Sequence, residues 1–418
     1  MRIILLAGGR GERLWPLTSS RPKPLIPILC KPLLDWHLDA IRESLGESDL
    51  TLVIGYKGEM IESRLRELGV NRYELVVQDP PMGTGDAVRK ALLKTVVQDE
   101  YVFLYYSDVF IYPQLIRGVI EKLVSERPSI LGVRVSDVSQ LGELLVSSDD
   151  KLLGVREKTG ETRPGVVNGG LMVLPSDELS DALSRIGLSP RGEYELTDAL
   201  NMLADKLDIN VVTIGEDDWS DIGTPWGYLE INRRVLRRMC GDKEECIFNE
   251  GFLEQRGSNC IEGRAYIGGP VEIGPFAHLR GDNVLCGNNK VGFSTQLKSS
   301  VVLEGAKLPH LNYVGDSVVG SKVNMGAGAI TANLRHDEKH IKSMLKGKLV
   351  STGMKKLGSI IGDEARIGIN ASLLPGVKIG YRAWIGSGCI VDRDVPDYSL
   401  VKCRQEIEIE KREADNED

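Results

Sequence analysis

The second half of the chain carries an aliphatic residue at every sixth position. A first series consists of Ile261, Ile267, Ile273, Leu279, Leu285, Val291, Leu297 and Leu303. A second series, in a register of its own, consists of Ile361, Ile367, Leu373, Ile379, Ile385 and Val391. Neither the helical nor the strand period produces a repeat of six, whereas three short strands per coil of about eighteen residues do. The repeat therefore predicts a hexapeptide solenoid.

Glycines and interruptions mark this repeat further. Seven glycines directly follow an aliphatic position, where we expect sharp corners: Gly268, Gly274, Gly292, Gly362, Gly368, Gly380 and Gly386. The aliphatic series lapses between Leu303 and Tyr313 and again between Met325 and Ile361. The second lapse contains the polar stretch 333–340, which we expect to project as a loop toward a neighbouring subunit.

The chain begins with an apolar run, residues 3–6, that ends at a group of glycines. Such a run predicts a buried parallel strand. Gly8, Gly9 and Gly11 allow the backbone to approach a phosphate chain closely, and Arg13 and Lys23 add positive charge. The prolines at positions 16, 22, 24 and 27 are expected to hold the next segment extended and to present Lys23. Neither Gly-Lys-Ser/Thr nor Gly-x-Gly-x-x-Gly is present, which disfavours ATPases and dinucleotide-binding oxidoreductases.

Strand and helix patterns alternate after this loop. Residues 50–56, 73–77 and 101–106 have strand patterns, and residues 33–41, 61–68 and 88–93 have helical ones. This alternation predicts an α/β domain with a parallel, Rossmann-like sheet covered by helices on both faces. Ligands of such sheets bind at the carboxyl ends of the strands, where Asp108 follows residues 101–106. His37 lies in a helical pattern and is expected to be structural.

The net charge and the short apolar runs argue against some classes of protein. A net charge of −8 argues against a nucleic-acid partner, which requires a basic face. No apolar run has the length of a membrane span, and no signal-peptide pattern opens the chain. The sequence therefore predicts a cytoplasmic protein with no membrane partner.

The seven cysteines are scattered and include no C-x-x-C pair. We therefore expect neither a zinc knuckle nor a dense disulfide framework. Cys240 and Cys246 flank an acidic stretch and could pair, and the sequence leaves this open.

The glycine loop, read as Gly-Gly-x-Gly-x-Arg-Leu-x-Pro-Leu-Thr followed by Pro-Lys-Pro-Leu, resembles the signature of sugar-1-phosphate nucleotidylyltransferases. The resemblance implies catalytic roles for Arg13 and Lys23 and a Mg²⁺ ion held by Asp108 and Asp221. It implies a nucleotide site formed by Leu6, Ala7, Gly8, Gly9, Gln78, Gly83 and Thr84, with Gln78 and Gly83 contacting the base. It further implies a sugar-phosphate site formed by Gly154, Glu157, Lys158 and Asn168. Because a sugar-1-phosphate oxygen is already a nucleophile, positioning and charge neutralisation should suffice for its attack on the α-phosphorus of a nucleoside triphosphate.

The solenoid resembles the left-handed parallel β-helix of acyltransferases, a family that is typically trimeric. The strings at 308–316 and 323–328 resemble those of the bifunctional N-acetylglucosamine-1-phosphate uridylyltransferase/glucosamine-1-phosphate acetyltransferase family. This resemblance implies that acetyl-CoA is a co-substrate and that His310 is the general base, since a neutral imidazole titrates in the right range. The implied sugar-phosphate ligands are Arg280, Lys298, Tyr313, Asn324, Asn333 and Lys339. Ile369 and Ser387 fit the acetyl-CoA contacts by position only.

These resemblances predict a bifunctional enzyme of UDP-N-acetylglucosamine biosynthesis. The expected parts are a nucleotidylyltransferase domain (1–225), a linker helix (226–246), a left-handed β-helix (247–403) and a charged tail (404–418). The segment 193–198 is closer to glucose-1-phosphate thymidylyltransferases, so the choices of UTP or dTTP and of glucose, N-acetylglucosamine or N-acetylgalactosamine stay open, as does the use of galactosamine-1-phosphate. The alternatives are a monofunctional nucleotidylyltransferase whose β-helix only assembles the oligomer, and a regulatory subunit without turnover.

Overall fold

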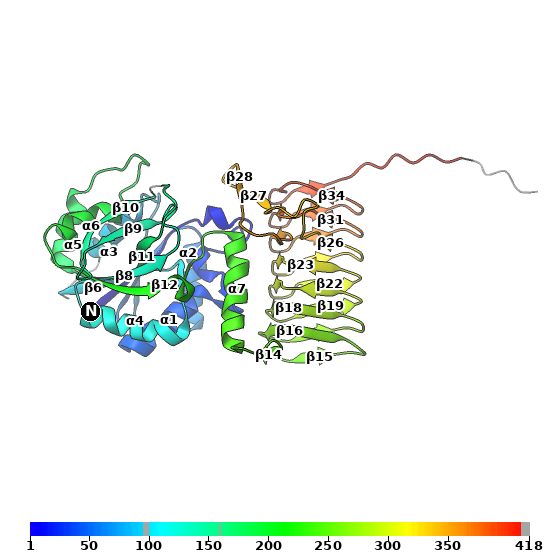
Figure 1. The fold of residues 1–418 in the computed structure, drawn as a ribbon, viewed down its shortest axis with the longest axis horizontal. Helices are drawn as coiled ribbons and strands as arrows, with labels where there is room; N and C mark the ends of the chain where they lie inside the picture. Colours follow the sequence, from blue (N-terminus) through cyan, green and yellow to red (C-terminus); the bar gives the residue numbers. More distant parts are fainter. Residues whose placement is uncertain (95–99, 159, 411–418) are drawn as a thin grey trace, which may run out of the picture.

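The computed structural model describes residues 1–94, 100–158 and 160–410. An α/β half and a stack of parallel strands lie side by side, and helix α7 (Pro225–Cys240) runs between them (Figure 1). Residues 411–418 of the expected charged tail lie outside the described residues. No helix in the described ranges is both long and apolar enough to cross a membrane.

The α/β half contains one mixed sheet. Strands β1 (Arg2–Ala7), β4 (Leu50–Ile54), β5 (Tyr73–Val77) and β6 (Tyr101–Tyr106) are parallel in the order β6-β1-β4-β5, as expected. Beyond β6, however, strand β11 (Gly165–Pro175) runs antiparallel, so the sheet is not parallel throughout. The remaining strands of the sheet are β8 (Ser129–Val135), β9 (Gly142–Val146), β10 (Leu152–Glu157) and β12 (Asn210–Gly215). A two-stranded pair is formed by β7 (Val109–Ile111) and β13 (Trp219–Asp221).

Helices bury both faces of this sheet. They are α1 (Leu33–Leu45), α2 (Gly58–Glu67), α3 (Thr84–Lys94), α4 (Pro113–Ser125), α5 (Ser176–Arg185) and α6 (Leu196–Ala204). Ile3 and Leu5 of β1 belong to the core on one face, whereas Ile4 belongs to the core on the other. Burial on both faces explains why β1 is apolar without alternation.

The proline-rich segment after the glycine loop is not extended, contrary to the prediction. It forms two short 3₁₀ turns, η1 (Glu12–Leu14) and η2 (Lys23–Leu25), and the small pair β2 (Pro27–Ile28) and β3 (Lys31–Pro32). Its apolar side chains are buried in a core that also contains residues of α7 and of the strand stack. Packing between the two halves therefore folds this segment back on itself.

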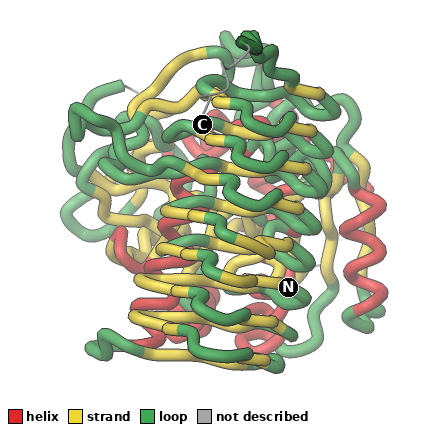
Figure 2. Tube along the Cα trace, turned by 90° about the vertical axis from the view of Figure 1, so that its right-hand side faces the viewer, coloured by secondary structure: helices red, strands yellow, loops and turns green. Residues whose placement is uncertain are grey.

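The second half is a coiled stack of short parallel strands, consistent with a left-handed β-helix (Figure 2). Leu279 pairs with Leu297, eighteen residues on, whereas Leu297 pairs with Val314, seventeen residues on. The shorter coil explains the first lapse in the aliphatic series. In that series Ile261 is partly buried, and the members from Ile267 to Leu297 are fully buried in the solenoid core, as the repeat predicts. Leu303 is buried instead in the core shared with α7, and Val302 takes the position equivalent to Leu285.

The strands of the stack are short. They are β14 (Cys246–Asn249), β15 (Leu253–Gln255), β16 (Cys260–Ile267), β17 (Val271–Ile273), β18 (His278–Leu285), β19 (Asn289–Phe293), β20 (Gln296–Lys298), β21 (Val301–Val302), β22 (Lys307–His310), β23 (Tyr313–Gly315), β24 (Val318–Val319), β25 (Asn324–Met325), β26 (Ile330–Thr331), β29 (Ile360–Ile361), β30 (Arg366–Ile367), β31 (Ser372–Leu373), β32 (Lys378–Ile379), β33 (Trp384–Ile385), β34 (Ile390–Val391) and β35 (Leu400–Val401).

Six of the seven repeat glycines lie at the turns between strands, as expected, but none of the seven has a positive φ. A Cβ at Gly368 would lie 2.5 Å from the backbone nitrogen of Ser387, and one at Gly380 would lie 2.4 Å from that of Asp397. Glycine is required because the next coil passes too close for a side chain. Positive φ angles occur instead at other residues of the stack, such as Asn370 and Arg382.

The second lapse is an insertion that ends in a hairpin. Residues 335–340 are exposed, and strands β27 (Lys342–Leu345) and β28 (Lys348–Ser351) follow as an antiparallel pair. In Figure 1 this hairpin lies between the stack and the α/β half of the same chain. Contact of residues 333–340 with a neighbouring subunit stays a prediction.

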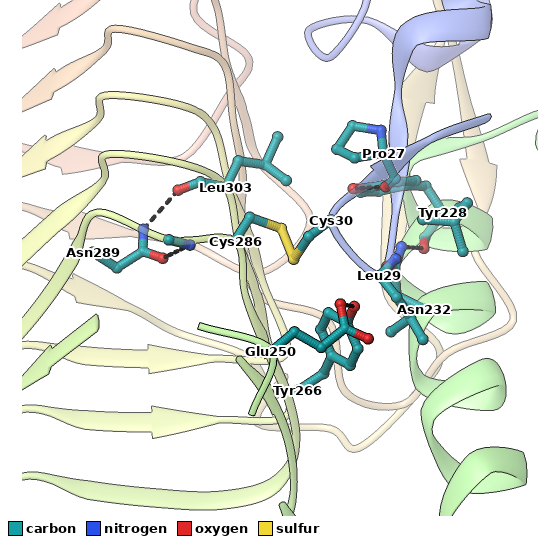
Figure 3. Close-up of a disulfide and its surroundings, with 12 residues drawn as sticks. Pro27, Leu29, Cys30, Tyr228, Asn232, Glu250, Tyr266, Cys286, Asn289 and Leu303 are labelled. Atoms are coloured by element: carbon teal, nitrogen blue, oxygen red, sulfur yellow. Dashed lines mark hydrogen bonds between the residues drawn. A yellow bond between two sulfur atoms is a disulfide. The ribbon is translucent and has the colours of Figure 1, made fainter. Parts of the chain in front are cut away.

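Covalent and polar contacts join the two halves. A disulfide links Cys30, in the segment after the glycine loop, to Cys286 of the stack (Figure 3). Beside it, Leu29 donates its backbone N–H to Asn232 of α7 at 2.9 Å, and the Tyr228 hydroxyl donates to the Pro27 carbonyl at 2.7 Å. Cys240 pairs with Cys246 and Cys389 pairs with Cys403. The pairing of Cys240 with Cys246, which the sequence left open, is therefore present, and the other two bridges were not expected.

Candidate active sites

A cavity of about 460 Å³ opens at the carboxyl ends of β1 and β6. All seven nucleotide-site candidates line it: Leu6, Ala7, Gly8, Gly9, Gln78, Gly83 and Thr84. Arg13, Lys23 and Asp108 line it as well. The parallel strands end at this edge because the strand-to-helix connections all leave on the same side.

Lys23 joins the two candidate metal ligands. Its ammonium nitrogen lies 2.9 Å from Asp108 Oδ2 and 3.7 Å from Asp221 Oδ1. Arg13 lies 3.9 Å from Asp221 Oδ2. Asp221 ends β13, which pairs with β7 directly after Asp108. The β7–β13 pairing therefore brings together two carboxylates that are far apart in the sequence.

The pKa values of the two carboxyl groups are shifted in opposite directions. Desolvation in the cleft raises the pKa of Asp108, but the adjacent Lys23 and then Arg13 lower it more, so this pKa lies below its ordinary value. For Asp221, desolvation outweighs the attraction of Lys23, and repulsion from Asp108 adds to it, so the pKa lies above its ordinary value. Asp221 is therefore the member of the pair that a cation would stabilise most.

The residues present fit a hard cation. Asp108 and Asp221 offer carboxylate oxygens on either side of one cationic nitrogen, and Mg²⁺ prefers oxygen ligands. No cluster of three or more His, Cys, Asp or Glu side chains with metal-binding geometry occurs among the described residues. A Mg²⁺ ion at this pair would therefore take its other ligands from phosphate and water, as this ion commonly does.

Gln78 is held in place beside the glycine loop. Its side-chain nitrogen donates to the carbonyl of Gly83 at 2.9 Å and to Asp86 at 3.0 Å. Its oxygen lies next to Gly8, where a Cβ would be 3.4 Å away. Gly83 has φ +97°, and a Cβ there would lie 2.5 Å from the Tyr194 carbonyl oxygen. The loop thus requires glycine at position 83, and the Gln78 oxygen faces the cavity as an acceptor.

The sugar-site candidates are not among the residues that line this cavity, and they do not all meet. Glu157 accepts from Thr197 at 2.9 Å and lies 3.5 Å from Arg191. Asn168 accepts from the Gly170 N–H at 2.9 Å, and Lys158 is exposed near Asp221. Gly154 is buried against Asn201 of α6 and does not line the cavity.

Four of the acetyl-transfer candidates meet around one buried aspartate. Asp316 Oδ2 accepts from Lys298 at 2.7 Å and from the Asn333 amide. Tyr313 lies beside Asn333 and Arg280, and burial raises its pKa. The buried Nε atom of Arg280 has no hydrogen-bond partner within the described ranges.

The other candidates lie elsewhere on the stack. His310 and Asn324 are exposed on β22 and β25, which belong to a different sheet from β18, β20 and β23. Lys339 is exposed in the insertion. Ile369 and Ser387 occupy consecutive coils, and the Gly388 N–H donates to the Ile369 carbonyl at 2.8 Å. A single chain therefore does not gather all of its predicted acetyl-transfer residues.

Sequence reasoning missed several residues at these sites. Asp316 stands inside a string that carried the resemblance, but no role was assigned to it. Arg10, Glu12, Glu193 and Lys346 line the first cavity. Lys346 comes from the stack, and no local pattern could indicate a contact across 334 positions.

The chain was compared with known proteins. The family model described as nucleotidyl transferase matches residues 2–238. A bifunctional sugar-1-phosphate nucleotidylyltransferase/acetyltransferase of Sulfurisphaera tokodaii is 38% identical over 94% of this chain and 98% of the relative. Proteins named bifunctional protein GlmU are 32% identical in Methanocaldococcus jannaschii, over 97% of this chain and 98% of the relative, and 34% identical in Methanococcus maripaludis, over 99% and 100%.

This similarity spans both the α/β half and the strand stack. It thus supports two transferase activities in one chain rather than a nucleotidylyltransferase with an inert oligomerisation module. The chain belongs to the family of bifunctional sugar-1-phosphate nucleotidylyltransferase/acetyltransferases.

Proposed function

We propose that residues 1–225 transfer a nucleotidyl group from UTP or dTTP to N-acetylglucosamine-1-phosphate or glucose-1-phosphate and release pyrophosphate. Residues 247–403 acetylate glucosamine-1-phosphate with acetyl-CoA, and residues 226–246 join the two parts. The observation that carries the first assignment is Lys23, which contacts both Asp108 and Asp221 at the mouth of the glycine-loop cavity.

Charge and position account for the nucleotidyl step. The loop amides of Gly8, Gly9 and Gly11 bind the triphosphate, and Arg13 and Lys23 neutralise charge as the sugar-phosphate oxygen bonds to the α-phosphorus and the bond to pyrophosphate breaks. Mg²⁺ bound at Asp108 and Asp221 would supply further neutralisation of phosphate charge. Asp108, with its lowered pKa, remains ionised for this role.

The side-chain amide of Gln78 recognises the base. With its nitrogen engaged by Gly83 and Asp86, its oxygen accepts a hydrogen bond from the ring N–H that uracil and thymine share. This contact accepts both pyrimidines and supports a broad choice between UTP and dTTP.

The acetyl step uses a neutral imidazole. His310 takes a proton from the substrate ammonium, the amine nitrogen bonds to the thioester carbonyl carbon, and the carbon–sulfur bond breaks to release coenzyme A as a thiol. Arg280, Lys298, Tyr313 and Asn333 hold the sugar phosphate, with Asn324 and Lys339 completing the site. Ile369 and Ser387 lie on coils that an extended coenzyme A chain could follow.

The separation of these residues supports a homotrimer. Arg280, Lys298, Tyr313 and Asn333 lie around Asp316, whereas His310 and Asn324 belong to another sheet of the stack. Packing the faces of neighbouring stacks together would complete the site between copies. The acetylated product is a substrate for the first site, which places both reactions in UDP-N-acetylglucosamine biosynthesis in the cytoplasm, where nucleoside triphosphates and acetyl-CoA are made.

The test measures both products from one preparation. Pyrophosphate release is followed with Mg²⁺, UTP or dTTP and each sugar-1-phosphate, and thiol release is followed with acetyl-CoA and glucosamine-1-phosphate. Lys23→Ala should lower the first rate at least about a hundredfold and leave the second unchanged. Loss of both rates, or of neither, would contradict the assignment of Lys23.

A further inference from the structure

The hairpin formed by β27 and β28 ends in a tip of defined geometry. Leu345 pairs with Lys348, which leaves Lys346 and Gly347 as the two turn residues. Both have positive φ, 48° and 77°. Positive φ at both central residues is the pattern of a type I′ turn, whose twist matches that of the strands beside it. The position of the Lys346 side chain is therefore set by a tight turn rather than by a loose loop.

The base of the hairpin is fixed to the stack. Ser343 is 3% exposed and donates its hydroxyl to the Gly376 carbonyl at 2.8 Å. Lys378 donates to the Met344 carbonyl and lies 3.2 Å from Asp394. These contacts restrict how far the hairpin can swing away from the stack.

The same lysine connects the hairpin to the glycine loop. The Lys378 ammonium lies 5.1 Å from the ring centroid of Trp15, which comes directly after η1. Trp15 also donates its indole N–H to Asp397 of the stack at 3.0 Å. The hairpin and the glycine loop thus both contact the same end of the stack, and these contacts restrict the distance between the hairpin and the loop.

The tip of the hairpin reaches the nucleotide cavity. Lys346 lines that cavity, and its ammonium lies 3.2 Å from Glu12 Oε2 in the glycine loop. Both side chains are 60% exposed. Because an exposed ion pair contributes little free energy, Lys346 can exchange Glu12 for a stronger anionic partner.

A triphosphate is such a partner. Glu12 places a negative charge in the loop that presents its amides to phosphate, and that charge would repel the ligand. In the absence of a ligand, Lys346 neutralises the charge of Glu12. When phosphate is present, Lys346 offers it a charge-assisted hydrogen bond. We propose that Lys346 binds the outer phosphates of the nucleoside triphosphate, and the pyrophosphate product, so that the acetyltransferase half completes the nucleotidyl-transfer site of the same chain.

This inference rests on the proposed placement of the triphosphate at the glycine loop. It adds to that proposal a residue of the solenoid half, Lys346, that contacts the phosphates. Since the contact is made in both the substrate and product complexes, its loss should act on KM more than on kcat.

The test compares Lys346→Gln with Lys348→Gln, an exposed lysine of the same hairpin that does not line the cavity. Lys346→Gln should raise KM for the nucleoside triphosphate, and KM for pyrophosphate in the reverse reaction, about tenfold, with kcat changed less than about twofold. Lys346→Arg should restore most of the affinity. Thiol release from acetyl-CoA should be unchanged in all three variants.

Glu12→Gln separates direct binding from loop support. If Lys346 binds phosphate, Glu12→Gln leaves KM unchanged or lowers it, because the repulsive charge is gone. If Glu12→Gln raises KM as much as Lys346→Gln does, and the double variant is no worse, Lys346 acts only by holding Glu12 and the inference is wrong. Equal KM values for Lys346→Gln and Lys348→Gln would overturn it as well. A parent enzyme that releases no pyrophosphate would instead remove the proposed function itself.

Discussion

Arg233 of helix α7 and Asp316 of the strand stack form a buried ion pair of 2.8 Å, with each side chain 6% exposed. The other oxygen of Asp316 accepts from Lys298 and Asn333, two of the acetyl-transfer candidates. One oxygen of Asp316 therefore contacts the helix that connects the halves, and the other contacts two residues of the proposed amino-sugar-phosphate site. We infer that it positions Lys298 and Asn333 without touching substrate itself.

Asp316→Asn should impair both stability and acetyl transfer. The variant removes the acidic partner of Lys298 and leaves the buried Arg233 with only Glu230, 3.7 Å away, and breaking a buried pair in this way costs about 3–5 kcal/mol of unfolding free energy. Chemical denaturation and thiol-release kinetics measure the two effects. Asp337→Asn is the matched control, because the exposed pair of Asp337 with Arg335 contributes little. Equal stability of the two variants would contradict this prediction.

His310→Ala should abolish only one of the two activities. Loss of the general base is expected to lower thiol release at least about a hundredfold, while pyrophosphate release is retained. His336→Ala, at an exposed position in the insertion, should behave as the parent does. If His336→Ala lowered the rate and His310→Ala did not, the general base would have to be reassigned.

Asp221→Asn should stabilise the protein while it impairs nucleotidyl transfer. Because desolvation raises the pKa of Asp221 in the folded state, its ionised form is disfavoured by folding at neutral pH. This cost disappears as the pH falls through the raised pKa, since the carboxyl is then protonated in the folded state. Without Mg²⁺, the variant should therefore have a higher unfolding midpoint than the parent at neutral pH, and the difference should shrink at acid pH. A lower midpoint at neutral pH would show that the attraction of Lys23 prevails over desolvation.

Cys286→Ser should lower stability without loss of either activity. Cys30 and Cys286 are 256 residues apart, and cross-linking a long loop stabilises by about 2–5 kcal/mol. The polar contacts beside the bridge, such as Leu29 with Asn232, keep the halves in place. Cys260→Ser, which removes an exposed free thiol, is the control.

Thiol titration tests the pairing directly. The native chain should react at one cysteine, Cys260, and the reduced and unfolded chain at all seven. Three or more reactive thiols in the native protein would exclude the set of three bridges.

Much of the fold could be predicted from local patterns. The six-residue period identified the solenoid because each of the three strands in a coil buries one aliphatic side chain. The same position recurs in the next coil, as Leu279 and Leu297 show. The apolar run at residues 3–6 identified the first strand because both faces of that strand are covered. The antiparallel β11 and the folded proline-rich segment were not predicted, since both depend on which elements pack beside them.

The structure brings the candidates for the proposed nucleotide site together more fully than those for the proposed acetyl-transfer site. Leu6 to Gly9 are consecutive at the end of β1, and Gln78 and Gly83 both lie in the loop that follows β5 at the same edge of the sheet, so topology alone brings them together. Topology does not bring His310 and Arg280 together in the same way, because β22 and β18, which carry them, belong to different sheets of the stack.

Local periodicity and motifs thus sufficed to specify the two folds, the glycine loop and the family, because each depends on residues that are close in sequence or repeat at a fixed interval. The contacts of Lys346 with Glu12, Arg233 with Asp316 and Cys30 with Cys286 arise only when the solenoid docks against the α/β half. Their geometry depends on how two separately patterned surfaces pack together, and no interval along the chain encodes that packing.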